Sequence, residues 1–224
     1  MRAGTTRLIA RSTADEAAAP TSALTGPSRF LKRSMDFAIA DVALLALLPV
    51  MLAAALAVAL TSRGPVFYTQ VRVGRDGRRF RMYKFRTMVE GADSRVEELR
   101  ADSADPAWLL LERDPRVTDV GRFLRTTSID ELPQLVNVLK GEMSLVGPRP
   151  VTPEIDGDID GWARRRVDVA PGMTGLWQVL GRTTIPFEEM LKLDYLYVTN
   201  WSLSQDLRLL VRTLPAVIKR RGVN

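Results

Sequence analysis

The chain has 224 residues, 46% of them hydrophobic and 26% charged, enough to bury the core of one large domain or of a domain with an appendage. It contains no Cys and no His, which excludes disulfides, thiolate nucleophiles, Ser–His triads and metal sites built from these residues. Any catalysis must use Asp, Glu, Lys, Arg, Tyr or Ser, or a hard cation held by oxygen atoms. The net charge of +6 favours anionic partners such as phosphates, acidic lipid headgroups or nucleic acid.

The first 30 residues are rich in Ala, Thr and Ser, carry Pro20 and Pro27, and show no sustained periodicity. Their arginines are scattered, and no apolar run follows them directly, which is unlike a signal peptide. We therefore expect residues 1–30 to form a mobile N-terminal tail.

Residues 35–60 form the most apolar stretch, and its only charges, Asp36 and Asp41, lie near its start. The stretch is long enough to cross a membrane, but Pro49 near its middle removes a backbone hydrogen bond and bends a helix. Basic residues flank both ends, a pattern that tends to keep both ends in the cytoplasm. We expect residues 31–62 to form a re-entrant membrane helix, broken at Pro49, that enters one leaflet and returns. A kinked single span and a buried core helix are the alternatives.

Residues 63–86 predict a short β-hairpin, because the β-prone runs 66–68 and 80–83 flank a turn between Gly74 and Gly77. A solvated edge hairpin, whose charges block aggregation, would explain the many basic residues of this segment. Their position directly after the apolar stretch favours an anion-binding face against the membrane surface. These basic residues are Arg63, Arg72, Arg75, Arg78, Arg79, Arg81, Lys84 and Arg86.

Residues 128–139 predict a helix that begins with two acids and ends at Gly141. Ser128 and Glu131 match a capping box at its start. Pro133 is better tolerated in a first turn than later, so a start one or two residues further on is the alternative. In the simplest interpretation Asp130 and Glu131 only complement the helix dipole. The same position binds phosphate and favours an ionised carboxylate, which can hold Mg²⁺ or attack phosphorus. Adjacent helical residues point about 100° apart, which suits one nucleophile and one proton handler. One apolar face of this helix is expected to hold Leu132, Leu135, Val136 and Leu139.

Three arginines lie close to these acids or in stiff loops. Arg125 precedes Asp130 by five residues, and Arg149 and Arg182 lie in loops rich in Gly and Pro. Guanidinium groups on stiff loops suit bidentate phosphate contacts, although each one alone could be a surface charge or a loop brace. Together, the apolar segment, the basic face, the carboxylates and the arginine loops predict phosphate chemistry at a bilayer surface.

Residues 206–221 predict a basic amphipathic helix interrupted at Pro215. It could lie on a membrane surface or pack as an ordinary surface helix on a core.

The mixed-charge segment 89–113 predicts an exposed helix and loop, to which we assign no chemical role. The expected fold class is therefore α+β and helix-rich: a single membrane-associated domain, with residues 63–224 as the catalytic domain after the membrane helix.

Six motifs follow one another along the chain: KRSMD at 32–36, QVRVG at 70–74, YKFRTM at 83–88, TDVGRFLRTTSIDELPQLVNVLKGEMSLVGPRP at 118–150, PGMTGLWQVLGR at 171–182 and LDYLYVTNWS at 193–202. This ordered set resembles the bacterial sugar transferase family. Its members are monotopic polyprenyl-phosphate phosphoglycosyl transferases that start capsule, exopolysaccharide and O-antigen assembly. The resemblance extends from about Lys32 to Gly222.

The resemblance implies transfer of sugar 1-phosphate from a UDP-sugar to undecaprenyl phosphate, with release of UMP, through a covalent aspartyl phosphosugar. Asp130 would be the nucleophile and a ligand of Mg²⁺, and Glu131 would take the proton from the incoming polyprenyl phosphate. Arg125 and Arg149 would hold phosphates. Further contacts would come from Gln70, Arg72, Lys84, Arg86 and Arg182.

The resemblance also implies a re-entrant helix broken at Pro49 and a place in the bacterial inner membrane, with the catalytic domain on the cytoplasmic face. An oligomer is compatible with it. Longer relatives carry several transmembrane helices and a soluble domain before the catalytic part, whereas this chain resembles the short form in architecture. Its segment 89–113 and its C-terminal helix resemble the longer members.

Other functions fit parts of the pattern. An ordinary glycosyltransferase would release UDP, a direct transfer would use Asp130 only as a metal ligand, and a membrane-bound scaffold would need no carboxylate at all. We expect no nucleic-acid partner, because the charge of +6 is modest, aromatic residues are few among the basic ones, and an apolar stretch of this length is out of place in such a module.

Overall fold

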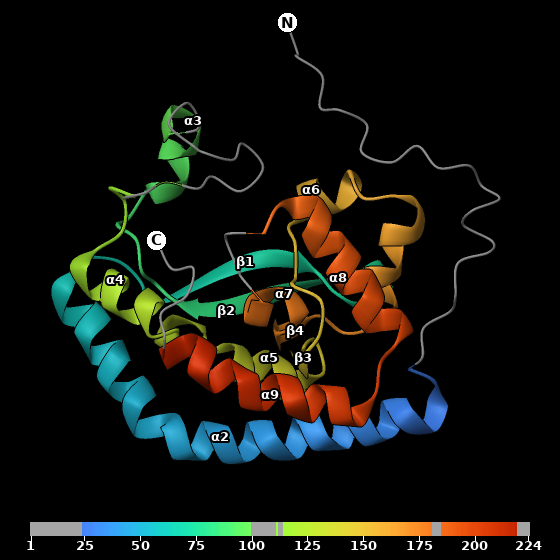
Figure 1. Cartoon of the computed structure of the whole chain (residues 1–224). Helices are drawn as coiled ribbons and strands as arrows, with labels where there is room; N and C mark the ends of the chain where they lie inside the picture. Colours follow the sequence, from blue (N-terminus) through green and yellow to red (C-terminus); the bar gives the residue numbers. More distant parts are fainter. Residues whose placement is uncertain (1–23, 100–110, 112–113, 181–184, 219–224) are drawn as a thin grey trace, which may run out of the picture.

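One long bent helix, α2 (Gly26–Thr61), runs along one side of the molecule, and the other elements pack on it (Figure 1). The computed structural model describes residues 24–99, 111, 114–180 and 185–218. The expected tail therefore lies outside the described residues up to residue 23. The elements after α2 are β1 (Phe67–Val73), β2 (Arg79–Phe85), α3 (Val96–Leu99), α4 (Asp119–Thr126), α5 (Gln134–Lys140), β3 (Ser144–Val146), α6 (Pro153–Gly157), β4 (Gly172–Thr174), α7 (Leu176–Leu180), α8 (Phe187–Thr199) and α9 (Leu203–Ile218), with short 3₁₀ helices at Arg75–Gly77, Ala92–Arg95, Ile129–Glu131 and Gly161–Asp168.

Helix α2 begins at Gly26, five residues before the expected boundary, so residues 26–30 are helical rather than part of the tail. The Ser28 side chain accepts a hydrogen bond from the Thr25 N–H at 3.0 Å, and Pro27 is tolerated in a first turn, where its missing N–H is not needed. Pro49 lies inside the helix, and the ribbon changes direction part-way along (Figure 1). Loss of a hydrogen bond and the clash of the proline ring explain such a bend.

Most of the apolar surface of α2 faces outward. It is the one helix among the described residues that is long and apolar enough to cross a membrane, and only 11% of its apolar window is buried. The alternative of a buried core helix is therefore wrong. Large apolar side chains remain exposed along its length: Phe30, Leu31, Phe37, Ile39, Val42, Leu45, Leu48, Val50, Leu52, Leu56 and Leu60.

The predicted hairpin is confirmed. Strands β1 and β2 pair antiparallel, with Phe67 opposite Phe85 and Arg72 opposite Phe80. Alternation along β2 buries Phe80 and Met82 while Arg79 and Arg81 stay exposed, which is the period expected of a sheet with one covered face. Phe85, at the end of the strand and on the other face, is buried against Ala54 and Val58 of α2.

A second, parallel strand pair was not predicted. Strands β3 and β4 are three residues each, and they bring the loop after Val146 beside the loop around Gly172. The Gly147 N–H donates to the Thr174 carbonyl at 2.9 Å, and the Gly172 N–H donates to the Pro148 carbonyl at 2.8 Å. Any side chain at Gly172 would collide with the backbone of Gly147, so glycine is required for this close approach. These two loops are distant in the sequence, and the β3–β4 pairing brings them into contact in the folded chain.

The helix predicted over 128–139 is divided. A 3₁₀ turn covers Ile129–Glu131, and α5 starts only at Gln134, directly after Pro133. Proline has no N–H to donate and favours the beginning of a helix, so the regular α-helix starts behind it. Its buried residues include Leu135 and Val138, and Gly141 ends it with φ of 83°, as expected.

Buried polar side chains fasten α2 to the rest of the fold. Lys32 Nζ lies 2.6 Å from Asp206 Oδ2, and both side chains are almost fully buried. The Tyr197 hydroxyl and the Trp201 indole N–H also lie within 3.0 Å of the Asp206 carboxylate. On the next turn of α2, Asp36 accepts hydrogen bonds from Ser144 at the start of β3 and from the Leu145 N–H. Lys32 is therefore an internal contact rather than a free charge at the flank of the membrane segment.

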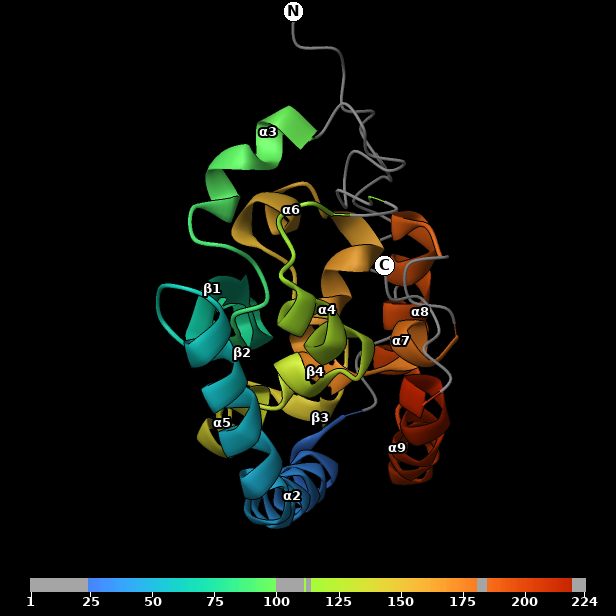
Figure 2. The same ribbon diagram turned by 90° about the vertical axis from the view of Figure 1, so that its left-hand side faces the viewer.

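Helix α9 runs through Pro215 and has two apolar sides. Leu209 is buried in the core, while Leu207 and Val211 are exposed. Figure 2 views α9 and the first part of α2 nearly end-on, so the two helices run in similar directions at one end of the molecule. The buried Leu209 agrees with packing as a surface helix, and the exposed Leu207 and Val211 agree with membrane contact, so both interpretations remain open.

Asp206→Ala should destabilise the fold by about 3–5 kcal/mol, because it leaves the buried Lys32 ammonium without its partner. Thermal unfolding in lipid nanodiscs measures this. Asp119→Ala, at a fully exposed side chain on α4, is the matched control and should change stability by less than about 0.5 kcal/mol. Equal effects of the two variants would contradict the role assigned to Asp206.

Candidate active site

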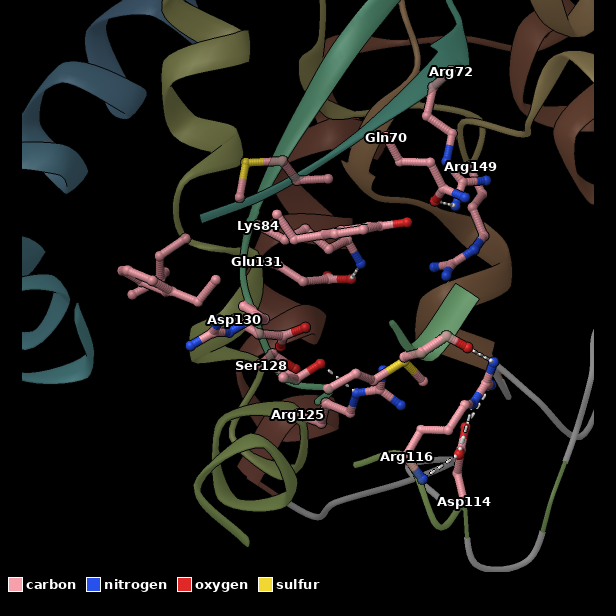
Figure 3. A pocket seen from close by; sticks show the side chains of 18 of the residues that line it. Gln70, Arg72, Lys84, Asp114, Arg116, Arg125, Ser128, Asp130, Glu131 and Arg149 are labelled. Carbon is pink, nitrogen blue, oxygen red and sulfur yellow. Dashed lines mark hydrogen bonds and ion pairs between the residues drawn. The ribbon is translucent and has the colours of Figure 1, made fainter. Parts of the chain in front are cut away.

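A cavity of about 800 Å³ opens between the hairpin, the 3₁₀ turn at residues 129–131 and the loops after β2 and β3 (Figure 3). Every sequence-predicted site residue that the structure describes lines this cavity. Arg182 lies outside the described residues. The predicted residues in the wall are Gln70, Arg72, Lys84, Arg86, Arg125, Asp130, Glu131 and Arg149.

A tight turn carries Asp130 into the wall. Helix α4 ends at Thr126, and Ser128 then takes a left-handed conformation with φ of 56°, which is uncommon for a residue other than glycine. The predicted capping box is therefore wrong: the Ser128 side chain caps no N–H of the following turn. The reversed backbone at Ser128 instead starts the 3₁₀ turn, in which Asp130 is 7% exposed.

Burial governs the chemistry of Asp130. Removal from water raises the pKa of its carboxyl group to about 6, and the neighbouring Glu131 adds to this rise. Lys84 and Arg125 oppose it by favouring the ionised form. At neutral pH the group is an ionised carboxylate that is poorly solvated and faces cations. Such a group is well suited to attack an electrophile whose negative charge those cations hold.

Glu131 differs from its neighbour in surroundings. Its carboxylate lies 2.8 Å from Lys84 Nζ, and 27% of its side chain is exposed. The two adjacent acids thus have different environments, one buried and one paired at the cavity edge, as the sequence predicted for two separate roles.

Arg125 stands beside Asp130, at the end of α4. Its Nε donates to the Thr87 hydroxyl at 2.9 Å, which fixes the side chain. Burial lowers the pKa of the guanidinium, and the attraction of Asp130 opposes that shift. Arg125 therefore offers a positioned cation next to the buried carboxylate.

Two further guanidinium groups converge from the hairpin and the loop after β3 (Figure 3). Arg149 stacks on the Trp177 ring with its central carbon 5.0 Å from the ring centre. Arg72 donates to the Pro150 carbonyl at 3.2 Å and to the Gln70 side chain. Burial, followed by repulsion from Arg149, lowers the pKa of Arg72 to about 10, so it is still charged at neutral pH. A bound anion between these like charges would relieve their repulsion.

Arg86 is turned toward backbone rather than toward open space. Its two terminal nitrogens donate to the Arg63 and Ser62 carbonyls and to the Ser62 hydroxyl, directly after the end of α2. It approaches Gly64 so closely that a side chain there would collide with it, and Gly64 has φ of 103°. Arg86 therefore braces the cavity wall against the end of α2 through its two terminal nitrogens, while its buried Nε has no partner among the described residues.

Sequence reasoning missed several lining residues. Asp114 and Arg116 form a paired clamp, with an N–O distance of 2.7 Å, and Arg116 also donates to the Ala92 carbonyl. The Asp-Pro-Arg run at 114–116 is a recognisable turn, and it was the available signal. Trp177 and Gln178 belong to the motif at residues 171–182 and lie in α7. No local sequence pattern indicated that this helix lines the cavity.

The carboxylates of the cavity could hold a metal ion only together with oxygen atoms of a bound substrate. Among the described residues no group of three or more Asp, Glu, His or Cys side chains could enclose an ion. Mg²⁺ is commonly held by one or two carboxylates together with substrate phosphates. Asp130 beside Glu131, in a cavity rimmed by cations, fits that mode and does not fit an ion held by the protein alone.

The chain belongs to the bacterial sugar transferase family, whose sequence pattern matches residues 27–220. Exopolysaccharide production protein ExoY of Rhizobium meliloti is 43% identical over 196 residues, which cover 85% of this chain and 87% of ExoY. The UDP-galactose-lipid carrier transferase of Erwinia amylovora is 46% identical and the undecaprenyl-phosphate galactose phosphotransferase of Salmonella typhimurium 44% identical, each over 204 residues. Those matches cover 87% of this chain and 42% of each relative, so this chain spans less than half the length of these two proteins.

Asp130→Asn should raise the free energy of unfolding by about 1–3 kcal/mol at pH 8. The folded-state pKa of Asp130 lies above its usual value, so ionisation penalises the folded protein above pH 6. The free-energy cost of an ionised Asp130 in the folded wild-type protein shrinks as the pH falls from 6 toward 4. The difference in unfolding free energy between Asp130→Asn and wild type should therefore disappear over the same range. Thermal unfolding of both proteins from pH 4.5 to 8 measures this. A constant difference across that range would contradict the assigned cause.

Proposed function

We propose that this protein transfers sugar 1-phosphate from a UDP-sugar to undecaprenyl phosphate and releases UMP, the initiating step of exopolysaccharide, capsule or O-antigen synthesis. The observation that carries the proposal is the buried Asp130 carboxylate facing Lys84 and Arg125 in a cavity that Arg72 and Arg149 also line. The names of the Salmonella relative and of a UDP-glucose:undecaprenyl-phosphate glucose-1-phosphate transferase of Escherichia coli, 38% identical over 200 residues, support this choice of substrates.

In the first half of the reaction an Asp130 oxygen attacks the β-phosphorus of the UDP-sugar. A bond forms between that oxygen and phosphorus, and the bond from phosphorus to the bridging oxygen breaks. UMP leaves with the bonding electron pair, and the sugar phosphate remains on Asp130 as an acyl phosphate. Arg125, Arg149 and Arg72 would bind the phosphate oxygens and stabilise the charge on the departing UMP.

In the second half an oxygen of undecaprenyl phosphate attacks the same phosphorus and displaces the Asp130 carboxylate. Glu131 would take the proton of the incoming phosphate. The Lys84 ammonium at 2.8 Å keeps Glu131 in place at the cavity edge. No step requires His or Cys, in agreement with the composition.

Mg²⁺ would be held by Asp130 together with phosphate oxygens of the donor. When bound, Mg²⁺ would neutralise part of the negative charge on the diphosphate of the donor. The protein contributes the carboxylate and the surrounding guanidinium groups, which orient the donor for attack.

The contacts of α2 support a re-entrant helix, which keeps the catalytic domain on one side of the membrane. We propose that this side is the cytoplasmic face of the inner membrane. The first part of α2 is fastened to β3 through Asp36, and its last part packs through Ala54 and Val58 on Phe85 and Leu124. A helix crossing the bilayer would carry one of these contact regions to the other side. A helix that bends at Pro49 and returns keeps both.

Asp130→Asn should abolish UMP release, by at least about 10³-fold, because the amide cannot act as the nucleophile. The measurement uses the full chain in lipid nanodiscs with Mg²⁺, undecaprenyl phosphate and a panel of UDP-sugars, with UMP and UDP separated. Asp119→Asn, exposed on α4, is the matched control and should retain activity. UDP as the product would establish an ordinary glycosyltransferase instead, and full activity of Asp130→Asn would exclude nucleophilic attack by this residue.

A second measurement separates a covalent route from direct transfer. Without lipid acceptor, a UDP-sugar labelled at the β-phosphate should leave label on the peptide that contains Asp130. Glu131→Gln should still become labelled but pass the label to undecaprenyl phosphate more slowly, by about 10²-fold, because it has lost the base. Absence of label in an enzyme that turns over would show direct transfer.

A further inference from the structure

One arm of the cavity has no part in the phosphate chemistry described above. It is the part of the cavity wall that β3, β4, α7 and α9 supply. Its lining among the described residues consists of an amide, two hydroxyls and three apolar side chains: Gln178, Thr174, Thr213, Leu145, Met173 and Leu210. None of these described side chains is charged, in contrast to the wall around Asp130.

Gln178 is the unusual member of this arm. Its side chain is 8% exposed, and its amide nitrogen is buried without a hydrogen-bond partner in the described part of the chain. Buried amide groups nearly always have partners, because an unmade hydrogen bond there is unfavourable. The two hydroxyls of the arm do not supply one: Thr174 and Thr213 lie 2.8 Å apart and bond each other, and Thr213 also donates to the Leu209 carbonyl. The unpaired amide therefore belongs to a side chain that lines the cavity.

The chemistry of the arm selects its occupant. A hydrocarbon chain would match the apolar walls but leave the Gln178 amide unpaired. A sugar presents many hydroxyls and would find few polar partners here. A pyrimidine base has apolar faces and one polar edge, on which a ring N–H lies beside a carbonyl oxygen. A glutamine amide has an adjacent acceptor and donor that match this edge with two parallel hydrogen bonds.

The arm and the phosphate site belong to the same cavity. Gln178 follows Trp177 in α7, and Arg149 stacks on the Trp177 ring. A nucleotide whose phosphates contact Arg149 would therefore have its base in the cavity that Gln178 lines. Gly175 leaves room for the amide, since a side chain added there would collide with the Gly147 carbonyl and press on Gln178 Oε1.

We infer that this arm of the cavity is the subsite for the uracil base of the donor, and that Gln178 binds the N3–H and carbonyl edge of that base. The inference rests on the proposed use of a UDP-sugar. It assigns Gln178 to recognition of the nucleotide, with no part in the attack on phosphorus.

The test compares UMP with N3-methyl-UMP, in which a methyl group blocks the ring N–H, by calorimetric titration of the full chain in lipid nanodiscs. The wild-type protein should bind UMP about tenfold more tightly than N3-methyl-UMP, as expected for loss of one or two hydrogen bonds. In Gln178→Met, which keeps the side-chain length but removes the amide, the ratio should fall to about one. Gln178→Asn, which withdraws the amide by one methylene group, provides a second variant and should also lose most of the ratio. Gln205→Met, on α9 and away from the cavity lining, is the matched control and should keep the ratio.

The outcomes separate this inference from the proposed function. Wild-type protein that releases UMP from a UDP-sugar, while Gln178→Met keeps the tenfold ratio, would overturn the base subsite and leave the transfer reaction standing. A Gln178→Met variant that weakens only the apparent affinity for undecaprenyl phosphate would overturn it in favour of a lipid subsite. Wild-type protein that neither binds UMP nor releases it from any UDP-sugar would overturn both.

Discussion

The buried ion pair between Lys32 and Asp206 is the contact on which the placement of the active site depends. A buried charge that loses its partner costs several kcal/mol, so α2 and α9 are held in one relative position. The Tyr197 hydroxyl, 2.8 Å from Asp206, is also 3.0 Å from the carbonyl of Val146, where β3 ends. The loop that carries Arg149 begins directly behind that residue. The Asp206 carboxylate is therefore connected both to α2 and to the end of β3, from which the Arg149 loop begins.

The cavity combines opposite charges in a way that serves phosphate chemistry. Asp130 is buried, which makes its carboxylate less stable, and the surrounding guanidinium groups are close enough to repel one another. The charge of a diphosphate donor would relieve the repulsion among the arginines, and these cations would hold its phosphorus beside the carboxylate. Under the proposed function, the exposed apolar surface of α2 would lie in a lipid phase, where the cavity could meet a polyprenyl phosphate.

Local patterns in the sequence predicted the elements well where one residue type dictates the backbone. The Gly74–Gly77 turn fixed the hairpin, Gly141 ended α5, and an apolar run broken by Pro49 gave one long bent helix. The capping box at Ser128 was wrong because Pro133 delays the helix and a left-handed Ser128 opens a different turn. The sequence could not show that Arg86, predicted as a substrate contact, also donates to the carbonyls of residues 62 and 63 at the end of α2.

The sequence by itself determined the kinds of group available: no His or Cys, two adjacent acids after a turn, arginines in stiff loops and one apolar helix. Together with its motifs, it also indicated the family to which the chain belongs. Only the tertiary structure decided which of these groups meet. Contacts between residues 149 and 177, or 32 and 206, join segments far apart in the chain and follow from the packing of helices and strands. The distinction between the buried Asp130 and the paired Glu131 arose in the same way, because burial is a property of the surroundings and not of the residue.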